Sequence, residues 1–352
     1  MHAAAMERRV YLAELGDSMP TGPPETVRPK SLTIDLTLRC PFRCPGCIER
    51  KAMGSAPGAS LAMGTVRRII ECFAAQGGEE ILLYGGEPTA YRQFDHVALL
   101  VASLRLRLKV VTNGAFLHQR RVADALVQAA ERVPVECRVS LNAGTAATHG
   151  EVHRASGHFP RVVAGMQGLK GSGVRLGVSF LLQEANAAEV LRAFEIAGQV
   201  GASDFWLRPM SGIHGIGVLP LSGEARFHAL QAIHTVRSLG AEAGLAFHVP
   251  AWHVAFLERG VEPDTRKTYP TCYYCAASRL VATPPEPGLV WGCTYWRAEP
   301  RFLVADLARV AFGSEAFERR RRATVRRVCP PADCAGVICN RHDANKVLWE
   351  SR

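Results

Sequence analysis

The chain has 352 residues, 48% of them apolar, which is enough to bury the core of one large domain and a smaller one and excludes a disordered or fibrous chain. No apolar run approaches the roughly 20 residues of a membrane span, and Met1 to Val10 lack the apolar stretch of a signal peptide, so we expect a soluble, cytoplasmic protein that does not bind a membrane. The net charge of +10, from 42 basic and 32 acidic residues, favours an anionic partner such as a carboxylate ligand, an acidic peptide or nucleic acid.

Short apolar or β-branched runs alternate with helical patterns from Leu32 to about residue 240. Residues 1–29 are polar and carry Pro20, Pro23 and Pro24, which break regular structure, so they predict a flexible lead-in. Strands are predicted at 32–38, 80–84, 108–112, 136–141, 174–182 and 204–208. Helices are predicted at about 61–76, 93–105, 120–133, 160–170, 187–200 and 222–240.

Each predicted strand reaches the next one through a helix, which favours parallel pairing with right-handed crossovers. Six such units fit an open barrel better than a closed eight-stranded one, so residues 30–240 are predicted to form a partial (β/α)6 TIM-like barrel of the α/β class. Ligands of such folds gather at the carboxyl ends of the strands. Candidate functional residues should therefore follow the strands directly.

The alternation is predicted to stop after about residue 241, where a cysteine-rich region begins. Arg279–Ala282 and Leu289–Tyr295 flank a proline-rich turn and predict a hairpin. We expect residues 241–352 to form a small second domain stapled by cysteines. A dense basic run, Arg319 to Arg322 with Arg326 and Arg327, falls on a predicted helix and is interpreted as a solvated face.

Eleven cysteines in a chain without an export signal favour metal ligation over disulfides, because the cytosol keeps thiols reduced. Three of them lie between positions 40 and 47, and six lie between 272 and 339. Cys72 and Cys137 stand alone, one in a helical and one in a strand pattern, and are predicted to be buried core residues.

The segment Cys40-Pro-Phe-Arg-Cys44-Pro-Gly-Cys47 follows the first predicted strand, and its three thiolates can converge on one metal centre. A closed zinc site uses four protein ligands, whereas a [4Fe–4S] cluster with three cysteines leaves one iron open to another ligand. The triplet therefore favours an iron–sulfur cluster, although short cysteine triplets also occur in zinc knuckles.

This C-x3-C-x2-C spacing after a first strand resembles the radical SAM superfamily. In that family the open iron is chelated by the amino and carboxylate groups of S-adenosylmethionine (SAM), and an electron from the cluster cleaves the sulfonium to methionine and a 5′-deoxyadenosyl radical. The resemblance implies that Cys40, Cys44 and Cys47 hold a catalytic [4Fe–4S] cluster, with SAM as a second cofactor and a flavodoxin or ferredoxin as electron donor.

Further motifs of the family follow the later strands in order. Gly85-Gly86-Glu87-Pro88 looks like the GGEP motif, in which the backbone and Glu87 receive the methionine ammonium and glycine lets the ligand approach closely. Asn113, in Thr112-Asn113-Gly114, matches a turn found in relatives, and Ser140-Leu141-Asn142 resembles an element that contacts the ribose and carboxylate side of SAM. Arg154 falls where many relatives place a carboxylate-binding arginine. Gly46 departs from the pattern, because relatives usually carry an aromatic residue there, near the adenine.

The cysteines of the C-terminal region resemble the SPASM and twitch extensions that follow many radical SAM cores. The segment from Cys275 to Cys293 reads C-x12-G-x4-C, the opening element that holds an auxiliary [4Fe–4S] cluster in those extensions. The later spacing, C-x4-C-x4-C, is not that of a full SPASM extension, so ligands for two complete auxiliary clusters are lacking. The preferred ligands of one auxiliary cluster are Cys272, Cys275, Cys293 and Cys339. A second centre of Cys329 and Cys334 with His342, or a zinc ribbon of the same cysteines, is the alternative.

The resemblance implies an oxidoreductase of natural-product biosynthesis, because auxiliary clusters of similar enzymes bind substrate or accept the electron left after hydrogen abstraction. One hypothesis is modification of a ribosomal peptide, with a separate leader-peptide-binding protein as a partner, since only about 30 residues precede the first strand. Another is oxidation or rearrangement of a sugar or aminocyclitol precursor. Arg208, His149 and Trp206 lie near strand ends and are candidate substrate contacts.

The rival hypothesis from another class is an RNA-directed or non-catalytic iron–sulfur protein, which the charge of +10 and the arginine run suggest. It predicts salt-sensitive RNA binding and no deoxyadenosine from SAM. Nucleic acid is not the partner we expect. A methyltransferase would need a methyl-carrying cysteine or a cobalamin domain, and the chain is too short for the latter.

Overall fold

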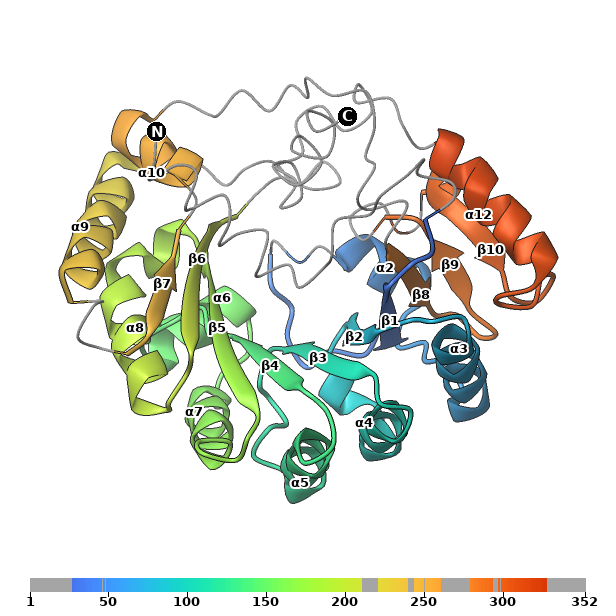
Figure 1. Ribbon diagram of the computed structural model, residues 1–352. Helices are drawn as coiled ribbons and strands as arrows, with labels where there is room; N and C mark the ends of the chain where they lie inside the picture. Colours follow the sequence, from blue (N-terminus) through green and yellow to red (C-terminus); the bar gives the residue numbers. More distant parts are fainter. Residues whose placement is uncertain are drawn as a thin grey trace.

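The computed structural model describes residues 27–45, 47, 49–210, 221–239, 244–249, 251–260, 279–293, 297 and 299–327. Along them strands alternate with helices, and every predicted strand and helix up to residue 239 is present (Figure 1). The strands are β1 (Ser31–Thr37), β2 (Glu80–Gly85), β3 (Arg107–Thr112), β4 (Val135–Ser140), β5 (Arg175–Leu182), β6 (Asp204–Pro209), β7 (Ala246–His248), β8 (Arg279–Thr283), β9 (Leu289–Trp291) and β10 (Leu303–Asp306). The helices are α2 (Arg50–Ser55), α3 (Met63–Ala75), α4 (Phe94–Ser103), α5 (Arg120–Ala130), α6 (Ala146–His153), α7 (Phe159–Gly168), α8 (Val190–Gln199), α9 (Gly223–Leu239), α10 (Ala251–Arg259) and α12 (Glu315–Arg327), with short 3-10 turns η1 (Pro88–Ala90), η2 (Glu184–Glu189) and η3 (Pro300–Phe302).

The strands form one sheet in the order β10-β9-β8-β1-β2-β3-β4-β5-β6-β7. From β8 to β7 all neighbours are parallel. The sheet curves into an open arc, and α3, α4, α5, α7, α8 and α9 lie on its outer side (Figure 1). This arrangement confirms the predicted partial α/β barrel, because each crossover helix returns the chain to the next parallel strand.

The strands beyond residue 241 extend the same sheet. β7 pairs with β6, so the alternation continues past the predicted stop; that expectation is wrong for residues 244–260, where a strand of three residues is too short to show a pattern. The predicted hairpin is confirmed as antiparallel β8 and β9. β8 also pairs in parallel with β1, which satisfies the backbone groups on an edge of β1 that would otherwise be exposed. A domain boundary near residue 241 stays a prediction.

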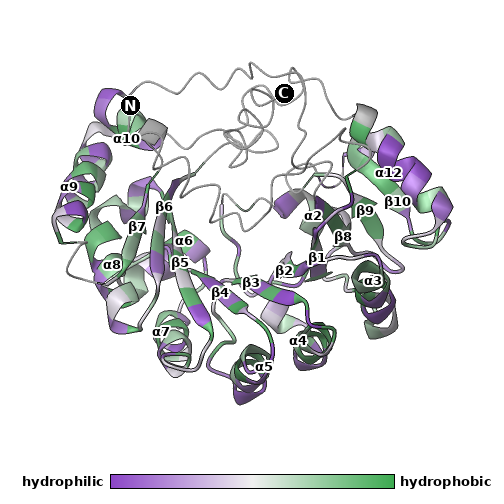
Figure 2. Cartoon of the chain, viewed as in Figure 1, coloured by the Kyte–Doolittle hydropathy of each residue, from purple (hydrophilic) through white to green (hydrophobic). Residues whose placement is uncertain are grey.

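β1 shows how the wall of the barrel is built, since all residues of Ser31–Thr37 are buried. Leu32, Ile34 and Leu36 belong to the apolar core between sheet and helices. Because alternate side chains of a strand point to opposite faces, Asp35 faces the interior of the arc. The outer helices mix hydrophilic and hydrophobic residues, as amphipathic helices with one buried face do (Figure 2).

The two isolated cysteines differ in their surroundings. Cys137 is fully buried in β4, as predicted. Cys72 is only half-buried, so its assignment to the core is wrong. Its thiol lies 3.3 Å from the carbonyl oxygen of Phe312, because the segment before α12 crosses this turn of α3.

The basic helix α12 has one arginine that the sequence did not distinguish. Arg319, Arg320 and Arg322 are exposed, which confirms the solvated face for them. Arg321 is buried, and its Nε donates to Glu318 (2.9 Å). Within the described ranges, no helix combines the length and the apolar character that crossing a bilayer requires.

Candidate active site

The loop after β1 carries the first group of cysteines. The backbone N–H of Leu38 donates to the carbonyl of Ala59 (2.7 Å), which holds the chain as it turns back at the carboxyl end of the strand. Within the loop the N–H of Cys47 donates to the carbonyl of Cys44 (3.3 Å). That carbonyl also accepts from the guanidinium of Arg50, the first residue of α2 (3.0 Å). Hydrogen bonds from the backbone and from Arg50 therefore shape the loop.

The donor set of this loop fits an iron–sulfur cluster. Burial raises the pKa of Cys40 and of Cys44 to about 12, and it also raises the pKa of Cys47. Thiols in such surroundings ionise only when a bound cation compensates the thiolate charge, as iron does. Among the described side chains, no three His, Cys, Asp or Glu are placed to hold a single metal ion, whereas the cysteines of a four-iron cluster bind separate irons.

Glu87 and Asn113 connect the cysteine loop to the ends of β2 and β3. Asn113 Nδ2 lies 3.4 Å from Cys40 Sγ, and the Asn113 N–H donates to Glu87 Oε2 (2.7 Å). The buried Glu87 carboxylate also accepts from the Thr112 hydroxyl (2.6 Å) and from the N–H (3.0 Å) and hydroxyl of Thr89. Burial raises the pKa of Glu87, and these hydrogen bonds oppose the rise. Both carboxylate oxygens are thus engaged with protein donors, so the predicted contact between this side chain and an ammonium group has competitors.

Gly85 and Gly86 are required by the protein's own backbone. A Cβ on Gly85, whose φ is +111°, would lie 2.8 Å from the Thr37 carbonyl oxygen, and a Cβ on Gly86 would lie 2.5 Å from that of Arg39. The N–H groups of Gly86 and Glu87 donate to these two carbonyls (2.9 and 2.8 Å). The need for glycine therefore has a cause within the protein itself, because this segment packs directly on the start of the cysteine loop. The close approach of a ligand stays a prediction. Pro88 follows, buried at the start of η1.

Asn142 joins the ends of β4 and β5. Its side-chain oxygen accepts from the N–H of Leu181 (2.8 Å), and its carbonyl accepts from Asn186 Nδ2 (3.0 Å). Ser140 is half-buried and lies opposite Ser179 in the β4–β5 register. The structure thus brings Ser140 and Asn142 to the same end of the sheet as the cysteine loop, with the Asn142 oxygen already bonded.

Two histidines of α6 lie beside the cysteine loop. The His153 ring is 4.6 Å from the Phe42 ring and 4.4 Å from the His149 ring, between centroids. His153 Nδ1 is 3.1 Å from Cys44 Sγ. Burial lowers the pKa of His149 to about 4 and that of His153 to about 3. Arg154, next in the chain, is exposed and ends α6 in a left-handed conformation (φ +49°).

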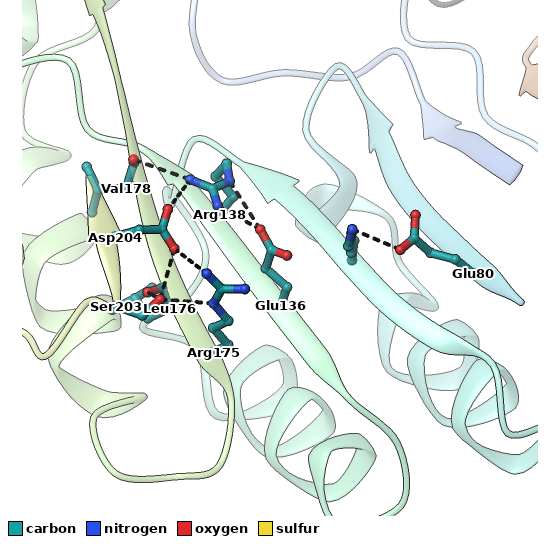
Figure 3. A network of polar contacts seen from close by, with 9 residues as sticks. Glu80, Glu136, Arg138, Arg175, Leu176, Val178, Ser203 and Asp204 are labelled. Carbon is teal, nitrogen blue, oxygen red and sulfur yellow. Dashed lines mark hydrogen bonds and ion pairs between the residues drawn. The ribbon is translucent and has the colours of Figure 1, made fainter. Parts of the chain in front are cut away.

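Ion pairs line the interior of the arc (Figure 3). Arg138 on β4 reaches Asp204 on β6, with 2.6 Å between Nη1 and Oδ1. Its guanidinium passes over Gly177 of β5, where a Cβ would meet it at 3.0 Å. Glu80 on β2 pairs with Lys109 on β3 (2.9 Å). These pairs keep the interior polar while the opposite face of each strand packs on the helices.

Trp206 continues this interior surface along β6. Its ring stacks on His248 of β7, with 4.6 Å between centroids. The guanidinium carbons of Arg208 and Arg138 lie 4.7 and 5.7 Å from its centroid. The structure therefore brings together two of the predicted substrate contacts, Trp206 and Arg208, while His149 lies in the aromatic cluster of α6.

A buried ionic cluster that sequence reasoning missed lies between β1 and the end of the cysteine loop. Arg297 contacts Asp35 Oδ2 (2.8 Å) and the carboxylate of Glu49, and its guanidinium carbon lies 5.0 Å from the centre of the Tyr84 ring. Burial raises the pKa of Asp35 to about 8, with Arg297 opposing and Glu49 adding to the rise. An aspartate within an apolar strand was the available signal, but its cation is 262 residues away in the chain.

Of the second cysteine group, the structure describes Cys293, which is half-buried and follows β9. The other members lie outside the described residues: Cys272, Cys275, Cys329, Cys334, Cys339 and His342, as does Gly46 of the first loop. Their assignment to an auxiliary centre stays a prediction.

Comparison with known proteins identifies a matching family and several relatives. The family model described as "Radical SAM superfamily" matches residues 34–200. The chain is 25% identical over 177 residues to the AdoMet-dependent heme synthase of Methanosarcina barkeri (strain Fusaro / DSM 804), covering 50% of this chain and 49% of that protein. It is 27% identical over 180 residues to the PqqA peptide cyclase of Gluconobacter oxydans (strain 621H), covering 49% and 47%. The chain spans about half the length of the curated relatives it matches.

The fold also matches solved structures of SuiB from Streptococcus suis. With S-adenosylmethionine bound, that protein superimposes with a TM-score of 0.61 and 15% identity, over 89% of this chain and 71% of SuiB. With the precursor peptide SuiA bound, the TM-score is 0.62 at 14% identity, over 89% and 70%. At this identity the likeness concerns the fold.

Proposed function

Since residues 34–200 make this chain a member of the radical SAM superfamily, we propose that it is an enzyme that cleaves SAM reductively and abstracts a hydrogen atom from a peptide. The observation that carries the proposal is the connection of Cys40, Glu87 and Asn113 at the carboxyl ends of β1, β2 and β3. The first cysteine of the triplet, a GGEP-like turn and an asparagine, which follow successive strands, are joined there by hydrogen bonds.

The cysteines Cys40, Cys44 and Cys47 are the proposed ligands of a [4Fe–4S] cluster. These cysteines would hold the cluster, which would supply the single electron needed for reductive cleavage of SAM and so the radical chemistry that removes a hydrogen atom from the substrate. The chain's own residues hold and orient the reactants. Because the Glu87 oxygens are engaged with Thr89, Thr112 and Asn113, we assign the methionine ammonium to main-chain carbonyls of the segment 85–88.

Of the remaining predicted SAM contacts, Ser140 and Arg154 keep their roles within this proposal, whereas Asn142 takes a structural one. Ser140 is assigned to the ribose, with Asn142 holding the ends of β4 and β5 in place. Arg154 is assigned to the SAM carboxylate, for which its exposed guanidinium at the end of α6 is accessible. A bidentate contact between arginine and carboxylate is the strongest single interaction of this kind.

A peptide is the proposed substrate. The names of two relatives support it: one is a peptide cyclase, and SuiB was solved with a precursor peptide. The net charge of +10 is complementary to an acidic peptide. An auxiliary cluster held by Cys272, Cys275, Cys293 and Cys339 is the proposed acceptor of the electron that remains on the substrate after hydrogen abstraction.

Anaerobic reconstitution with iron and sulfide, followed by reduction in the presence of SAM, tests the core of this proposal. We expect wild-type protein to release 5′-deoxyadenosine and methionine, and a Cys40/Cys44/Cys47→Ala variant to release neither. Cys72→Ala is the matched control, because Cys72 is a half-buried cysteine on α3, outside the loop, and should keep full turnover.

The substrate class is read in the same preparation. The mass of a peptide encoded beside the gene should fall by the mass of the hydrogen removed when wild-type protein, SAM and reductant are all present. The mass of an aminocyclitol should remain unchanged. Salt-sensitive RNA binding without deoxyadenosine formation would instead establish the RNA-directed alternative and end the enzymatic proposal.

A further inference from the structure

His153 contacts the cysteine loop through both its backbone carbonyl and its imidazole ring. Its carbonyl accepts from the N–H of Arg43 (2.9 Å), and its Nδ1 lies 3.1 Å from the sulfur of Cys44. The ring is 1% exposed, so water does not compete for this contact. One residue of α6, 109 positions away in the chain, thus holds the middle cysteine of the triplet.

The direction of this hydrogen bond follows from the chemistry of the sulfur. A free thiol can donate to an imidazole nitrogen, but a sulfur bound to iron has lost its hydrogen. A ring without hydrogen on Nδ1 would then place two lone pairs against each other at 3.1 Å. Nδ1 of His153 must therefore carry the hydrogen and donate it to the Cys44 sulfur when the loop holds a cluster.

The surroundings of the ring keep it in this orientation. Phe42 covers one side, tilted at 34° with its centroid 4.6 Å away, and His149 packs at 4.4 Å. Nε2 of His153 finds no hydrogen-bond partner among the described residues, so rotating the ring would exchange one bond for none. Burial makes such an exchange costly.

We propose that His153 is a positioning residue that donates a hydrogen bond to the Cys44 sulfur and thereby raises the reduction potential of the cluster held by Cys40, Cys44 and Cys47. Reduction adds negative charge to the cluster, and a donor aimed at a ligand sulfur stabilises that charge. This inference rests on the proposed function, because it requires a cluster at these cysteines. It goes beyond that function by assigning a role to a residue that lies outside the sequence motifs.

A redox titration followed by electron paramagnetic resonance on reconstituted full-length protein tests the inference. We expect His153→Phe, which keeps an aromatic ring and removes the donor, to shift the midpoint potential to more negative values. His153→Asn, whose amide can donate from a position close to that of Nδ1, should restore most of the shift. His158→Phe is the matched control: its ring also packs on Phe42, at 5.1 Å between centroids, and its substitution should leave the potential unchanged.

A second measurement needs no substitution at position 153. In wild-type protein labelled with ¹⁵N-histidine, pulsed electron paramagnetic resonance of the reduced cluster should detect a weak ¹⁵N coupling, and His158→Phe should retain it. A cluster that cleaves SAM but shows no such coupling, or a His153→Phe potential equal to that of wild type, overturns this inference and leaves the proposed function standing. Wild-type protein that assembles no cluster overturns both.

Discussion

Arg297 is the cation that pairs with two buried carboxylates, Asp35 and Glu49, and replacing it by methionine tests how this cluster is held. Each of the three side chains is at most 3% exposed. A buried guanidinium needs one anion, and burial keeps a proton on the other carboxylate, in line with the pKa of about 8 for Asp35. In Arg297→Met the ionised carboxylate loses its cation and takes up a proton as well.

The free energy of that extra proton sets the magnitude. In the unfolded chain an aspartate titrates near 3.8 and a glutamate near 4.5, and each pH unit between that value and neutrality is worth about 1.4 kcal/mol. The variant should therefore lose about 3.5 to 4.5 kcal/mol of unfolding free energy at pH 7, as buried ion pairs do when one partner is removed. A carboxyl group whose pKa is higher in the folded than in the unfolded protein costs no stability below its unfolded pKa, and it costs more as the pH rises above that value. The deficit should thus shrink to about 1 kcal/mol near pH 5.

Urea unfolding of the cluster-free protein, followed by tryptophan fluorescence between about pH 5 and pH 7, measures this deficit. Arg322→Met removes an exposed arginine of α12 and is the matched control. It should stay within about 0.5 kcal/mol of wild type throughout. An Arg297→Met protein as stable as wild type at pH 7, or one with the same deficit at both ends of the range, would refute the reasoning.

Other substitutions test single contacts. Glu286→Ala removes a carboxylate of the β8–β9 turn that accepts from an N–H at the start of α3 (2.7 Å). Loss of this cap should lower the free energy of unfolding by about 1 kcal/mol, and an unchanged urea midpoint would count against the prediction. Gly86→Ala puts a Cβ 2.5 Å from a carbonyl oxygen of the cysteine loop and should abolish most iron incorporation. Gly168→Ala, whose Cβ would have no neighbour within 4 Å, should incorporate iron normally, and equal iron content in the two variants would contradict the packing argument. Burial raises the pKa of Asp204, but the charge of Arg138 outweighs it and holds that pKa below 3.8, so the pair stabilises above the unfolded pKa and its contribution is lost as the pH falls. Asp204→Asn should therefore be less stable than wild type at neutral pH and converge with it in acid, which urea midpoints at both pH values will show.

Local patterns in the sequence were sufficient for much of the fold. The period of apolar residues distinguishes strand from helix, and the order of the elements then implies parallel pairing, so the strands from β1 to β6 were predicted within a residue or two. The pattern failed at β7, where Ala246–His248 is too short to show a period. It also gave no sign that β8 would pair with β1, because pairing between distant strands leaves no local trace.

The candidate site divides in the same way. The cysteine triplet and the glycines of 85–86 were visible in the sequence, since ligand spacing and turn chemistry are local properties. Their neighbours were not visible: Glu87 is bonded by donors of β3, and the glycines face the carbonyls of residues 37 and 39. Arg154 was singled out in the sequence and its neighbour His153 was not, because the contact of His153 with Cys44 appears only when α6 is folded onto the loop.

By itself, the sequence determined which segments are strands and helices, where the chain turns, and that three thiols stand together after the first strand, because each of these depends on residues close together in the chain. The tertiary structure alone decided which charges meet in the interior, which donor reaches which sulfur, and where the C-terminal hairpin joins the sheet. Those contacts depend on which residues meet in the folded molecule. Residues as far apart in the chain as Asp35 and Arg297 come into contact only when burial of the apolar core brings them together.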